Sequence, residues 1–333
     1  MKTPHRVFFA FPPRGMDERR VAVVTGANAG VGRHTALGLA KLGFHVVLGC
    51  RSAERGIEAV EYIKASVEGA SAEVMALDLS DLESVSAFTD QLLSKHDKVH
   101  ALVLNAGIGG MGIVPKPTAD DSKDDLMYRV NFVGHFLLVR QLLTTLRKTA
   151  ERSDGKVRVV CLSSVTHRGG DPSSWASCIR YRPRVSTYST SKLAMAVFAA
   201  ELTRRYAEHG VNAIAVNPGA VNSDIWYRSQ LSNWQEAIVK PVFSSLFLTS
   251  SQGSACSIAA VADPRYETPN PGLYLCPYRT PWRMPMPFEL HGPFAGAREC
   301  RPHPAVLDAA AGQALWDTTS AHLRTWLAKY NAS

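Results

Sequence analysis

The chain has 333 residues, a length that suits one large α/β domain or two smaller ones. Hydrophobic residues make up 46% and charged residues 20%, which is ordinary for a globular protein. The net charge of +8 is scattered apart from the run RYRPR at 180–184, and no nucleic-acid-binding motif accompanies it, so we expect no nucleic-acid partner.

The sequence also limits membrane and targeting segments. It holds no run of 18 apolar residues, so we predict no transmembrane helix. Residues 1–19 combine arginines with an apolar patch that Pro12 and Pro13 interrupt, which favours a flexible leader over a signal peptide. These features do not determine the compartment, and a cytoplasmic location is favoured.

From residue 20 onward, short apolar runs alternate with helical stretches. The runs typical of strands are 20–25, 45–50, 72–78, 99–107, 156–164 and 210–219. The stretches with helical periodicity are 29–43, 54–66, 82–95, about 121–150 and 187–208. Because the strand runs are almost continuously apolar, they fit a parallel sheet buried on both faces. The alternation predicts the α/β class, with a Rossmann-type doubly wound parallel sheet in a single domain over 20–276.

The C-terminal part is expected to be an elaboration of this domain. Residues 277–304 are Pro-rich and show neither helical nor strand periodicity, so we predict an irregular insertion. A C-terminal helix is predicted within 305–333, at about 305–329. Its expected inner stripe consists of Leu315, Trp316, Leu323, Trp326 and Leu327.

The six cysteines, at 50, 161, 178, 256, 276 and 300, form no Cys-x-x-Cys pair. Cys50 and Cys161 lie in strand-like runs, which favours buried reduced thiols over a disulfide framework. Cys300, His303 and His291 are zinc-ligand types that lie close together in the sequence. The regular spacing and the fourth ligand of a zinc site are absent, so we expect no metal.

A glycine-rich segment, Thr25–Gly32, joins the first strand to the first helix. Its glycines would let a pyrophosphate approach the backbone N–H groups, and the helix N-terminus adds partial positive charge. The spacing, G-x-x-x-G-x-G, differs from the G-x-G-x-x-G dinucleotide fingerprint. Its place between strand and helix nevertheless favours a nucleotide site.

The end of the second strand indicates which dinucleotide is bound. Positions 49–53 hold no Asp or Glu for a ribose 2′-hydroxyl, but they include Arg51. Arg33, in the glycine segment, is a second cation. Two guanidinium groups can grip a phosphate in bidentate fashion, so we predict NADP(H) as the cofactor.

Tyr188 and Lys192 are four positions apart at the start of a predicted helix and therefore share one face. Taken alone, the pair is better explained as two polar residues on a solvated helix face. A free tyrosine has a pKa near 10, and one cation about 4 Å away, at an effective dielectric of about 20, supplies roughly 4 kcal/mol, enough to bring that pKa near neutrality. A catalytic Tyr188 would then act as a general acid or base.

Seven motifs in this order resemble the short-chain dehydrogenase/reductase superfamily, over about 20–276. They are Thr25-Gly26-x-x-x-Gly30-x-Gly32, Asp78, Asn105-Ala106-Gly107, Asn131, Ser164, Tyr188-x-x-x-Lys192 and NPGAV at 217–221. The resemblance implies a dinucleotide-binding and catalytic domain over 20–276. The stretches at residues 26–43, 130–138 and 187–202 are most similar to the retinol-dehydrogenase-like branch, which mostly handles hydrophobic carbonyls and alcohols, often with NADP.

The resemblance implies a role for each matching residue. Tyr188 would be the general acid/base, Lys192 would also hold the nicotinamide ribose, Ser164 would hydrogen-bond the substrate oxygen, and Asn131 would steady a proton-relay water. Ser163 is expected to support them. Further cofactor contacts are expected from the following residues: Thr25, Gly26, Asn28, Gly30, Val31, Gly32, Arg33, Arg51, Asp78, Leu79, Asn105, Ala106, Gly107, Pro218, Gly219, Val221 and Ser223.

The predicted function is therefore an NADP-dependent oxidoreductase that interconverts a carbonyl and an alcohol. The apolar segment 241–248 favours a hydrophobic substrate, although it would alternatively contact a membrane surface or a second copy in a homodimer. Ser164 and Tyr188 are farther apart than in many members, so residues 167–186 should form an extra loop near the site. Reduction of an activated C=C bond and a catalytically silent NADP-binding regulator remain alternatives.

Overall fold

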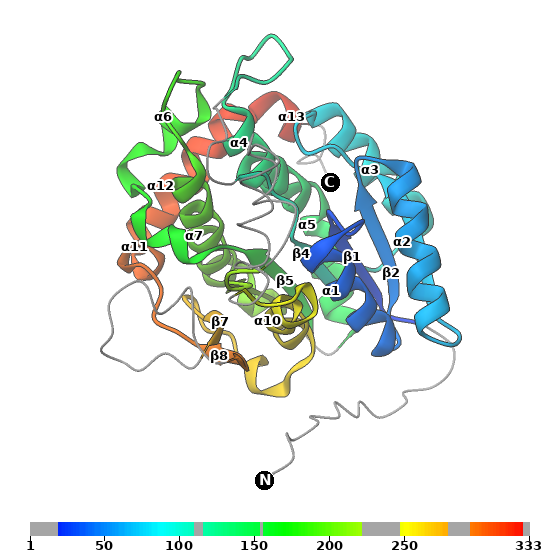
Figure 1. Cartoon of the computed structure of the whole chain (residues 1–333). Helices are drawn as coiled ribbons and strands as arrows, with labels where there is room; N and C mark the ends of the chain where they lie inside the picture. The colour runs from blue at the N-terminus through cyan, green and yellow to red at the C-terminus, as the bar shows by residue number, and fades with distance from the viewer. Residues whose placement is uncertain (1–18, 110–115, 154–155, 222–246, 279–293, 329–333) are drawn as a thin grey trace, which may run out of the picture.

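The computed structural model describes residues 19–109, 116–153, 156–221, 247–278 and 294–328 (Figure 1). Its centre is one eight-stranded sheet, in the order β3-β2-β1-β4-β5-β6-β7-β8. The strands are β1 Val21–Thr25, β2 His45–Cys50, β3 Ser71–Ala76, β4 Ala101–Leu104, β5 Val157–Leu162, β6 Val211–Val216, β7 Tyr274–Tyr278 and β8 Phe294–Glu299. Strands β1 to β7 are parallel and β8 is antiparallel to β7. The predicted Rossmann-type doubly wound sheet in a single domain is confirmed.

Helices follow most of these strands. The longer ones are α1 Gly30–Lys41, α2 Ala53–Ser66, α3 Leu82–Lys95, α5 Gly134–Arg152, α7 Tyr188–Tyr206, α10 Ser250–Ala262 and α12 Ala309–His322. The short ones are α4 Leu126–Tyr128, α6 Trp175–Ile179, α11 Pro304–Leu307 and α13 Arg324–Ala328, together with a π-helical turn over Arg129–Val133. Short 3₁₀ turns occupy Val165–Gly169, Pro172–Ser174, Ala207–His209 and Pro264–Tyr266.

Two hydrophobic layers cover the two faces of the sheet. One contains residues of α3, α5, α7 and the C-terminal helices, with Phe132, Phe136 and Phe198 near its centre. The other contains residues of α1, α2 and α10. Strands β1, β4, β5 and β6 are buried at every position, as expected of parallel strands between two helical layers.

The C-terminal elaboration differs from the prediction. Within 277–304, the described residues include β8, which pairs with β7 rather than forming an irregular loop. An edge strand held by backbone pairing has no need of an apolar run, so its sequence carried no strand periodicity. The predicted helix at 305–329 is divided at Asp308, whose carboxylate caps α12, and at Leu323, where α12 ends. The predicted inner stripe is right: Leu315, Trp316, Leu323 and Leu327 are buried, and Trp326 packs against them.

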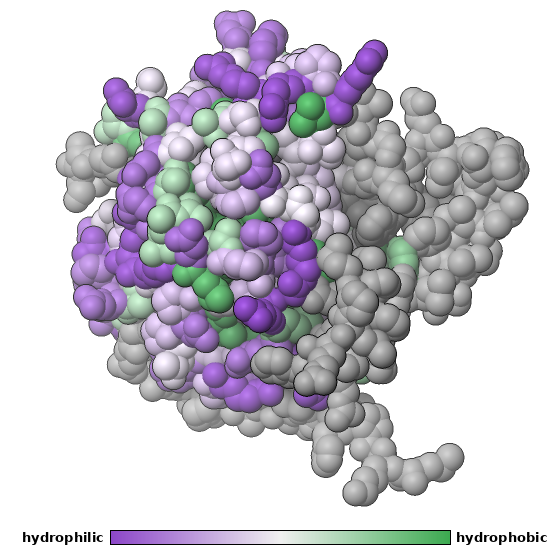
Figure 2. All heavy atoms as spheres, turned by 90° about the vertical axis from the view of Figure 1, so that its left-hand side faces the viewer, coloured by the Kyte–Doolittle hydropathy of each residue, from purple (hydrophilic) through white to green (hydrophobic). Residues whose placement is uncertain are grey.

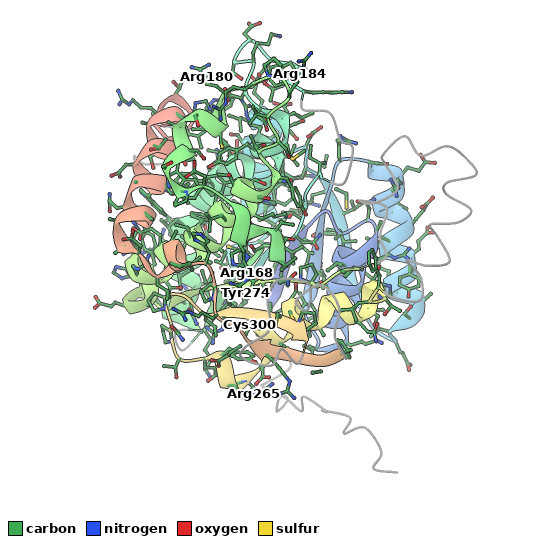
Figure 3. The ribbon with its side chains drawn as sticks, turned by 60° about the vertical axis from the view of Figure 1, so that its left-hand side comes forward. Arg168, Arg180, Arg184, Arg265, Tyr274 and Cys300 are labelled. Carbon is green, nitrogen blue, oxygen red and sulfur yellow. A yellow bond between two sulfur atoms is a disulfide. The ribbon has the colours of Figure 1, made fainter. Side chains whose placement is uncertain are left out.

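Four of the six cysteines are reduced, as predicted, and the other two are not. Cys50, Cys161, Cys178 and Cys256 are free and buried, whereas Cys276 and Cys300 form a disulfide, which corrects the expectation for these two. The antiparallel pairing of β7 and β8 brings their Cα atoms to 6.2 Å, a relation that sequence spacing does not reveal. Figure 3 shows Cys300 beside Tyr274 of β7.

Among the described residues, few large hydrophobic side chains are exposed. The exposed large hydrophobic residues are scattered over several elements: Ile57, Tyr62, Val185, Phe294 and Leu307. Figure 2 shows hydrophilic groups around small apolar areas on the face that carries α6, α11 and α12. Arg180 and Arg184 of the basic run lie together at one end of the molecule (Figure 3). Among the described residues, no helix is long and apolar enough to cross a membrane.

Three segments that the sequence singled out are the N-terminal leader, the apolar stretch 241–248 and the extra segment 167–186. The leader expected at 1–19 lies, except for residue 19, outside the described residues, as does most of 241–248. The segment 167–186, predicted to form an extra loop near the site, is described, and it includes parts of two 3₁₀ turns and the short helix α6. The aromatic ring of Trp175 in α6 is buried, so this segment is anchored to the body of the domain.

Candidate active site

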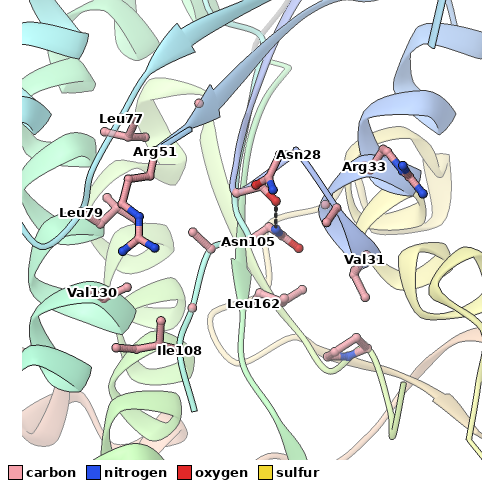
Figure 4. Close-up of a pocket in the computed structure, with 18 of the residues that line it drawn as sticks. Asn28, Val31, Arg33, Arg51, Leu77, Leu79, Asn105, Ile108, Val130 and Leu162 are labelled. Carbon is pink, nitrogen blue, oxygen red and sulfur yellow. Dashed lines mark hydrogen bonds between the residues drawn. The ribbon is translucent and has the colours of Figure 1, made fainter. Parts of the chain in front are cut away.

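A pocket of about 520 Å³ opens at the carboxyl ends of the central strands (Figure 4). This is where ligands bind in open α/β sheets. The predicted site residues that line it are Gly26, Asn28, Gly30, Val31, Gly32, Arg33, Arg51, Asp78, Leu79, Asn105, Ala106, Gly107, Ser164, Tyr188, Lys192, Pro218, Gly219 and Val221. Thr25 and Asn131 lie behind its wall, and Ser223 lies outside the described residues.

The glycine segment forms one end of the pocket. Gly26 and Gly30 have φ values of +64° and +55°, in the left-handed region that glycine adopts without steric cost. The helix α1 begins directly after Ala29, and no side chain caps its N-terminus. Its first N–H groups therefore face the pocket without a side-chain partner, as an anion site at a helix terminus requires.

Close packing fixes the shape of this segment. A Cβ atom at Gly32 would lie within 2.5 Å of Asn105 Nδ2, so glycine is required there. That amide group donates hydrogen bonds to the carbonyl oxygens of Thr25, at 2.8 Å, and Gly26, at 3.3 Å. Asn105, directly after β4, thus holds the glycine turn in place.

Thr25 supports the pocket from the inside. It is fully buried, and its hydroxyl oxygen accepts hydrogen bonds from the backbone N–H groups of Asn105, at 2.9 Å, and Ala106, at 3.0 Å. The same oxygen lies 2.9 Å from Nε2 of His135 in α5. Burial lowers the pKa of His135 to about 3, so its ring is neutral at physiological pH. The sequence analysis missed His135 because its contact is made across 110 residues.

The two arginines predicted to share a phosphate lie apart. Figure 4 shows Arg51 and Arg33 on opposite sides of the pocket. The Arg33 guanidinium lies over the ring of Tyr62, 4.7 Å from its centre. The pocket wall next to Arg51 includes Ser52 and Arg55 instead, which the sequence analysis did not select. Both residues could have been identified from the sequence by their position shortly after the second strand.

Tyr188 and Lys192 lie in the first turn and a half of α7, on the pocket wall with Ser164. Ser164 lies close enough to the Tyr188 phenol for its hydroxyl to lower the pKa of Tyr188. Lys192 Nζ lies 5.9 Å from the centre of the Tyr188 ring and donates a 3.2 Å hydrogen bond to the carbonyl oxygen of Leu162. The Ser163 hydroxyl donates to the carbonyl oxygen of Lys192 at 2.7 Å, which ties α7 to the end of β5.

Burial dominates the protonation of this pair. It raises the pKa of Tyr188 above 10, and the Ser164 hydroxyl opposes this only in part. It lowers the pKa of Lys192 from 10.5 to about 8. The sequence-based expectation that Lys192 lowers the pKa of Tyr188 is therefore wrong for this structure: burial raises that pKa, and Ser164 is the group that opposes the rise.

Asn131 uses its side chain to hold neighbouring segments. Its Nδ2 donates to the Ile108 carbonyl oxygen at 2.9 Å and to Ser191 Oγ at 3.0 Å, and its Oδ1 accepts from the Ile108 N–H at 2.8 Å. It lies in the π-helical turn, a feature often found near functional sites. A Cβ atom at Gly107 would lie 3.2 Å from Asn131 Oδ1 and 3.3 Å from Lys192 Nζ, so the three residues meet behind the pocket.

The remaining predicted positions form the other walls. Asp78 accepts hydrogen bonds from the Ser80 N–H and hydroxyl, which shapes the turn after β3. Gly219 has a φ of +80°, and its N–H donates to Asn217 Oδ1 at 2.9 Å. Val221 forms a bridge with Leu248. Four apolar residues that were not among the predicted site residues also line the pocket: Ile108, Leu126, Val130 and Leu162.

These features fit a dinucleotide. The uncapped helix N-terminus and the glycine turn suit a pyrophosphate. Arg33 Nε is buried without a hydrogen-bond partner beside this turn. Such an unpaired donor is costly unless a ligand satisfies it.

A model of the family described as short chain dehydrogenase matches residues 20–233. The chain belongs to this family. Nicotinamide cofactors are a property of the family, and the resemblance predicted from the seven motifs is confirmed.

Two relatives illustrate the similarity. The chain is 37% identical over 249 residues to dehydrogenase/reductase SDR family member 13 of Bos taurus, a match covering 73% of this chain and 63% of the bovine protein. It is 36% identical over 247 residues to retinol dehydrogenase 12 of Mus musculus, covering 72% of each chain. The alignment thus spans less than two thirds of the length of the bovine relative. These similarities support the retinol-dehydrogenase-like branch.

A solved structure of an uncharacterised protein from Mycobacterium paratuberculosis shares the fold. It superimposes with a TM-score of 0.62 at 25% sequence identity, covering 90% of this chain and 92% of that chain.

Proposed function

We propose that this protein is an NADP(H)-dependent oxidoreductase that interconverts a carbonyl and an alcohol on a hydrophobic substrate. The observation that carries the proposal is that Ser164, Tyr188 and Lys192 line the same pocket as the glycine turn and Arg51. A bound nicotinamide ring would supply or accept the hydride. The chain's own residues must then bind the substrate oxygen and move one proton.

Tyr188 is the proposed proton donor. Its pKa, raised by burial, keeps the phenol protonated near neutral pH, which suits donation to an oxygen that gains negative charge. Ser164, which lines the same pocket wall as the phenol, would hydrogen-bond the same substrate oxygen. These two hydroxyls thereby orient a carbonyl oxygen before the reaction.

Lys192 is the proposed cation of the site. Its ammonium group is buried beside the Tyr188 ring and stabilises the phenolate that proton donation leaves behind. By the family resemblance it also binds the nicotinamide ribose. The side-chain amide of Asn131 already donates hydrogen bonds to Ile108 and Ser191. Asn131 is therefore proposed to hold these two residues in position rather than to touch the substrate.

The preference for NADP(H) rests on Arg51. It follows β2 and points into the pocket (Figure 4), where Ser52 and Arg55 also line the wall. A guanidinium and a hydroxyl group at this position suit a 2′-phosphate, and no carboxylate between 49 and 53 opposes it. Arg33 is proposed to contact the pyrophosphate side of the cofactor instead, because it lies at the start of α1.

A hydrophobic substrate is supported by the apolar wall of Ile108, Leu126 and Val130. This wall lies in the same pocket as Ser164 and Tyr188, and apolar pockets with few polar groups favour apolar ligands. The similarity to retinol dehydrogenase 12, an enzyme named for a lipophilic alcohol, points the same way.

The direct test is a panel of ketones, aldehydes and enones offered to the purified protein with NADPH. Cofactor oxidation is followed by absorbance, and the products are identified by mass spectrometry. Alcohol products from lipophilic aldehydes or ketones are expected. Saturated ketones formed from enones would instead support C=C reduction, and NADPH binding without turnover of any panel member would support a silent regulator.

A further inference from the structure

Three potential metal ligands meet at the edge of the sheet, away from the pocket. His45 is the first residue of β2, Glu73 lies in β3, and His96 follows the last residue of α3. His45 Nε2 lies 3.1 Å and His96 Nε2 2.8 Å from the same carboxylate oxygen, Glu73 Oε1. Their ligand atoms all lie within 4.8 Å of one another. His45 and Glu73 precede His96 by 51 and 23 positions in the sequence, and the fold brings the three side chains together.

The surroundings orient two of the three ligands. His45 Nδ1 lies 2.7 Å from Ser71 Oγ, a hydroxyl that can accept from Nδ1–H and so leave the Nε2 lone pair directed at the centre of the cluster. Lys95 Nζ donates to Glu73 Oε2 at 2.7 Å, which fixes the carboxylate with its other oxygen toward the histidines. A partner on the other ring nitrogen, as His45 has, is characteristic of metal-binding histidines.

The donor set selects the kind of ion. Two imidazole nitrogens and one carboxylate oxygen suit Zn²⁺ and its neighbours among the transition metals, whereas Ca²⁺ and Mg²⁺ prefer oxygen ligands. Tetrahedral zinc with bonds of about 2.0–2.1 Å separates its ligand atoms by roughly 3.3 Å. The distances of 3.1 and 2.8 Å require only a small opening of the cluster to admit the ion.

The cluster is also accessible to solvent. The side chains of His45, Glu73 and His96 are 17%, 25% and 15% exposed, so an ion can enter and a water molecule can complete the coordination. None of the three residues lines the candidate active-site pocket. Figure 1 shows β2 and α3 together at one side of the molecule.

We propose that His45, Glu73 and His96 form a binding site for Zn²⁺, with water as the fourth ligand. The ion would join β2, β3 and the end of α3. Because it would bind the folded chain and not the unfolded one, its effect would be to stabilise the outer part of the sheet. Lys95 acts against it, since its ammonium group lies on the same carboxylate and repels a cation. The proposal is independent of the proposed oxidoreductase activity.

The test uses the full chain, freed of metal by a chelator and then dialysed. Zn²⁺ is added in a calorimetric titration, and thermal unfolding is recorded with and without the ion. We expect saturable one-to-one binding and a higher Tm. His96→Gln, which retains a hydrogen-bond donor for Glu73 but is a poor zinc ligand, should weaken binding at least about 10-fold. His209→Gln, which removes an exposed histidine elsewhere, should not change it.

A second variant keeps the test decisive if His96→Gln proves unstable. Lys95→Gln removes the competing ammonium group, so it should tighten Zn²⁺ binding and enlarge the rise in Tm. Co²⁺ bound to the wild-type protein should show the visible absorption of a tetrahedral site, and His45→Gln should abolish it. The proposal is overturned if the wild-type protein shows no saturable binding, or if His96→Gln and Lys95→Gln bind Zn²⁺ as the wild-type protein does.

Discussion

Thr187 donates a 2.6 Å hydrogen bond to Oδ1 of Asp125, and both side chains are buried. The same oxygen accepts a 2.8 Å hydrogen bond from the backbone N–H of Tyr128. Thr187 directly precedes Tyr188, and Asp125 caps the short helix that leads to Asn131. One carboxylate oxygen therefore fixes the start of α7 relative to the π-helical turn, so these two parts of the candidate site are held together.

Thr187→Val should disturb this arrangement without changing the volume of the side chain. It leaves Asp125 with one donor fewer in a buried place, at a cost of about 1–3 kcal/mol. We expect kcat to fall about 10-fold and the dissociation constant of NADPH to stay unchanged. Thr203→Val is the matched control, because Thr203 is also buried and hydrogen-bonded but lies at the far end of α7. Equal losses of kcat in both variants would show that only stability is affected.

Gly109 determines where the Tyr188 ring can lie. A Cβ atom at this position would lie 2.2 Å from Cε2 of that ring, so Gly109→Ala must displace the phenol. Misplacement of a reacting group by about 1 Å can cost about 100-fold in rate. We expect a loss of turnover on this scale with normal NADPH binding. Gly169→Ala is the control, since its Cβ has open space apart from one contact at 4.0 Å, and turnover of both variants at wild-type rates would contradict the expectation.

The parts of the site that follow a strand end could be predicted from the sequence. The glycine turn, Arg51, the segment Asn105–Gly107 and Ser164 all lie directly after apolar runs, and parallel strands bring their carboxyl ends to one edge. Tyr188 and Lys192 share one face of a helix, but it was the other motifs of the chain that distinguished them from a chance pair. The residues that line the pocket could therefore be predicted largely from local sequence patterns.

The supporting contacts could not be predicted because they join distant parts of the chain. Asp125 and Thr187 are separated by 62 positions, and Thr25 and His135 by 110. The position of the Arg33 side chain could not be predicted for a similar reason, since its guanidinium lies over Tyr62 of α2 and across the pocket from Arg51. Pairing of β8 with β7 and the disulfide between them likewise depend on tertiary structure.

Arg51 should determine the choice between NADPH and NADH. Arg51→Asp replaces a cation by an anion where a 2′-phosphate would bind, so the preference should shift toward NADH by roughly 1.5–3 kcal/mol, about 10- to 150-fold. Arg33→Gln should alter the affinity for the two cofactors by the same factor, because Arg33 lies across the pocket from Arg51. Isothermal titration with both cofactors measures this, and a wild-type preference for NADH would refute the assignment.

Lys192→Met should make the protein more stable at neutral pH and inactive. Burial lowers the pKa of Lys192 from 10.5 to about 8, which corresponds to a cost of about 3 kcal/mol for the buried charge. This cost is fully present below about pH 8 and disappears as the pH rises to 10.5. After subtraction of about 1 kcal/mol for the lost hydrogen bond to Leu162, a gain of about 2 kcal/mol remains at pH 7. Urea unfolding at pH 7 and at pH 10.5 tests this, and a variant less stable than wild type at pH 7 would contradict it.

Tyr188→Phe should separate chemistry from binding. It retains the ring that packs against Gly109 and removes only the hydroxyl that would donate the proton. We expect turnover to fall about 100-fold or more, the usual scale of general acid catalysis, with NADPH affinity nearly unchanged. Lys192→Ala should reduce both quantities, because one ammonium group would serve the phenol and the cofactor. Tyr206→Phe, at the other end of α7, is the control. Wild-type kcat in Tyr188→Phe would leave the pair as two neighbours on a helix with no role in catalysis.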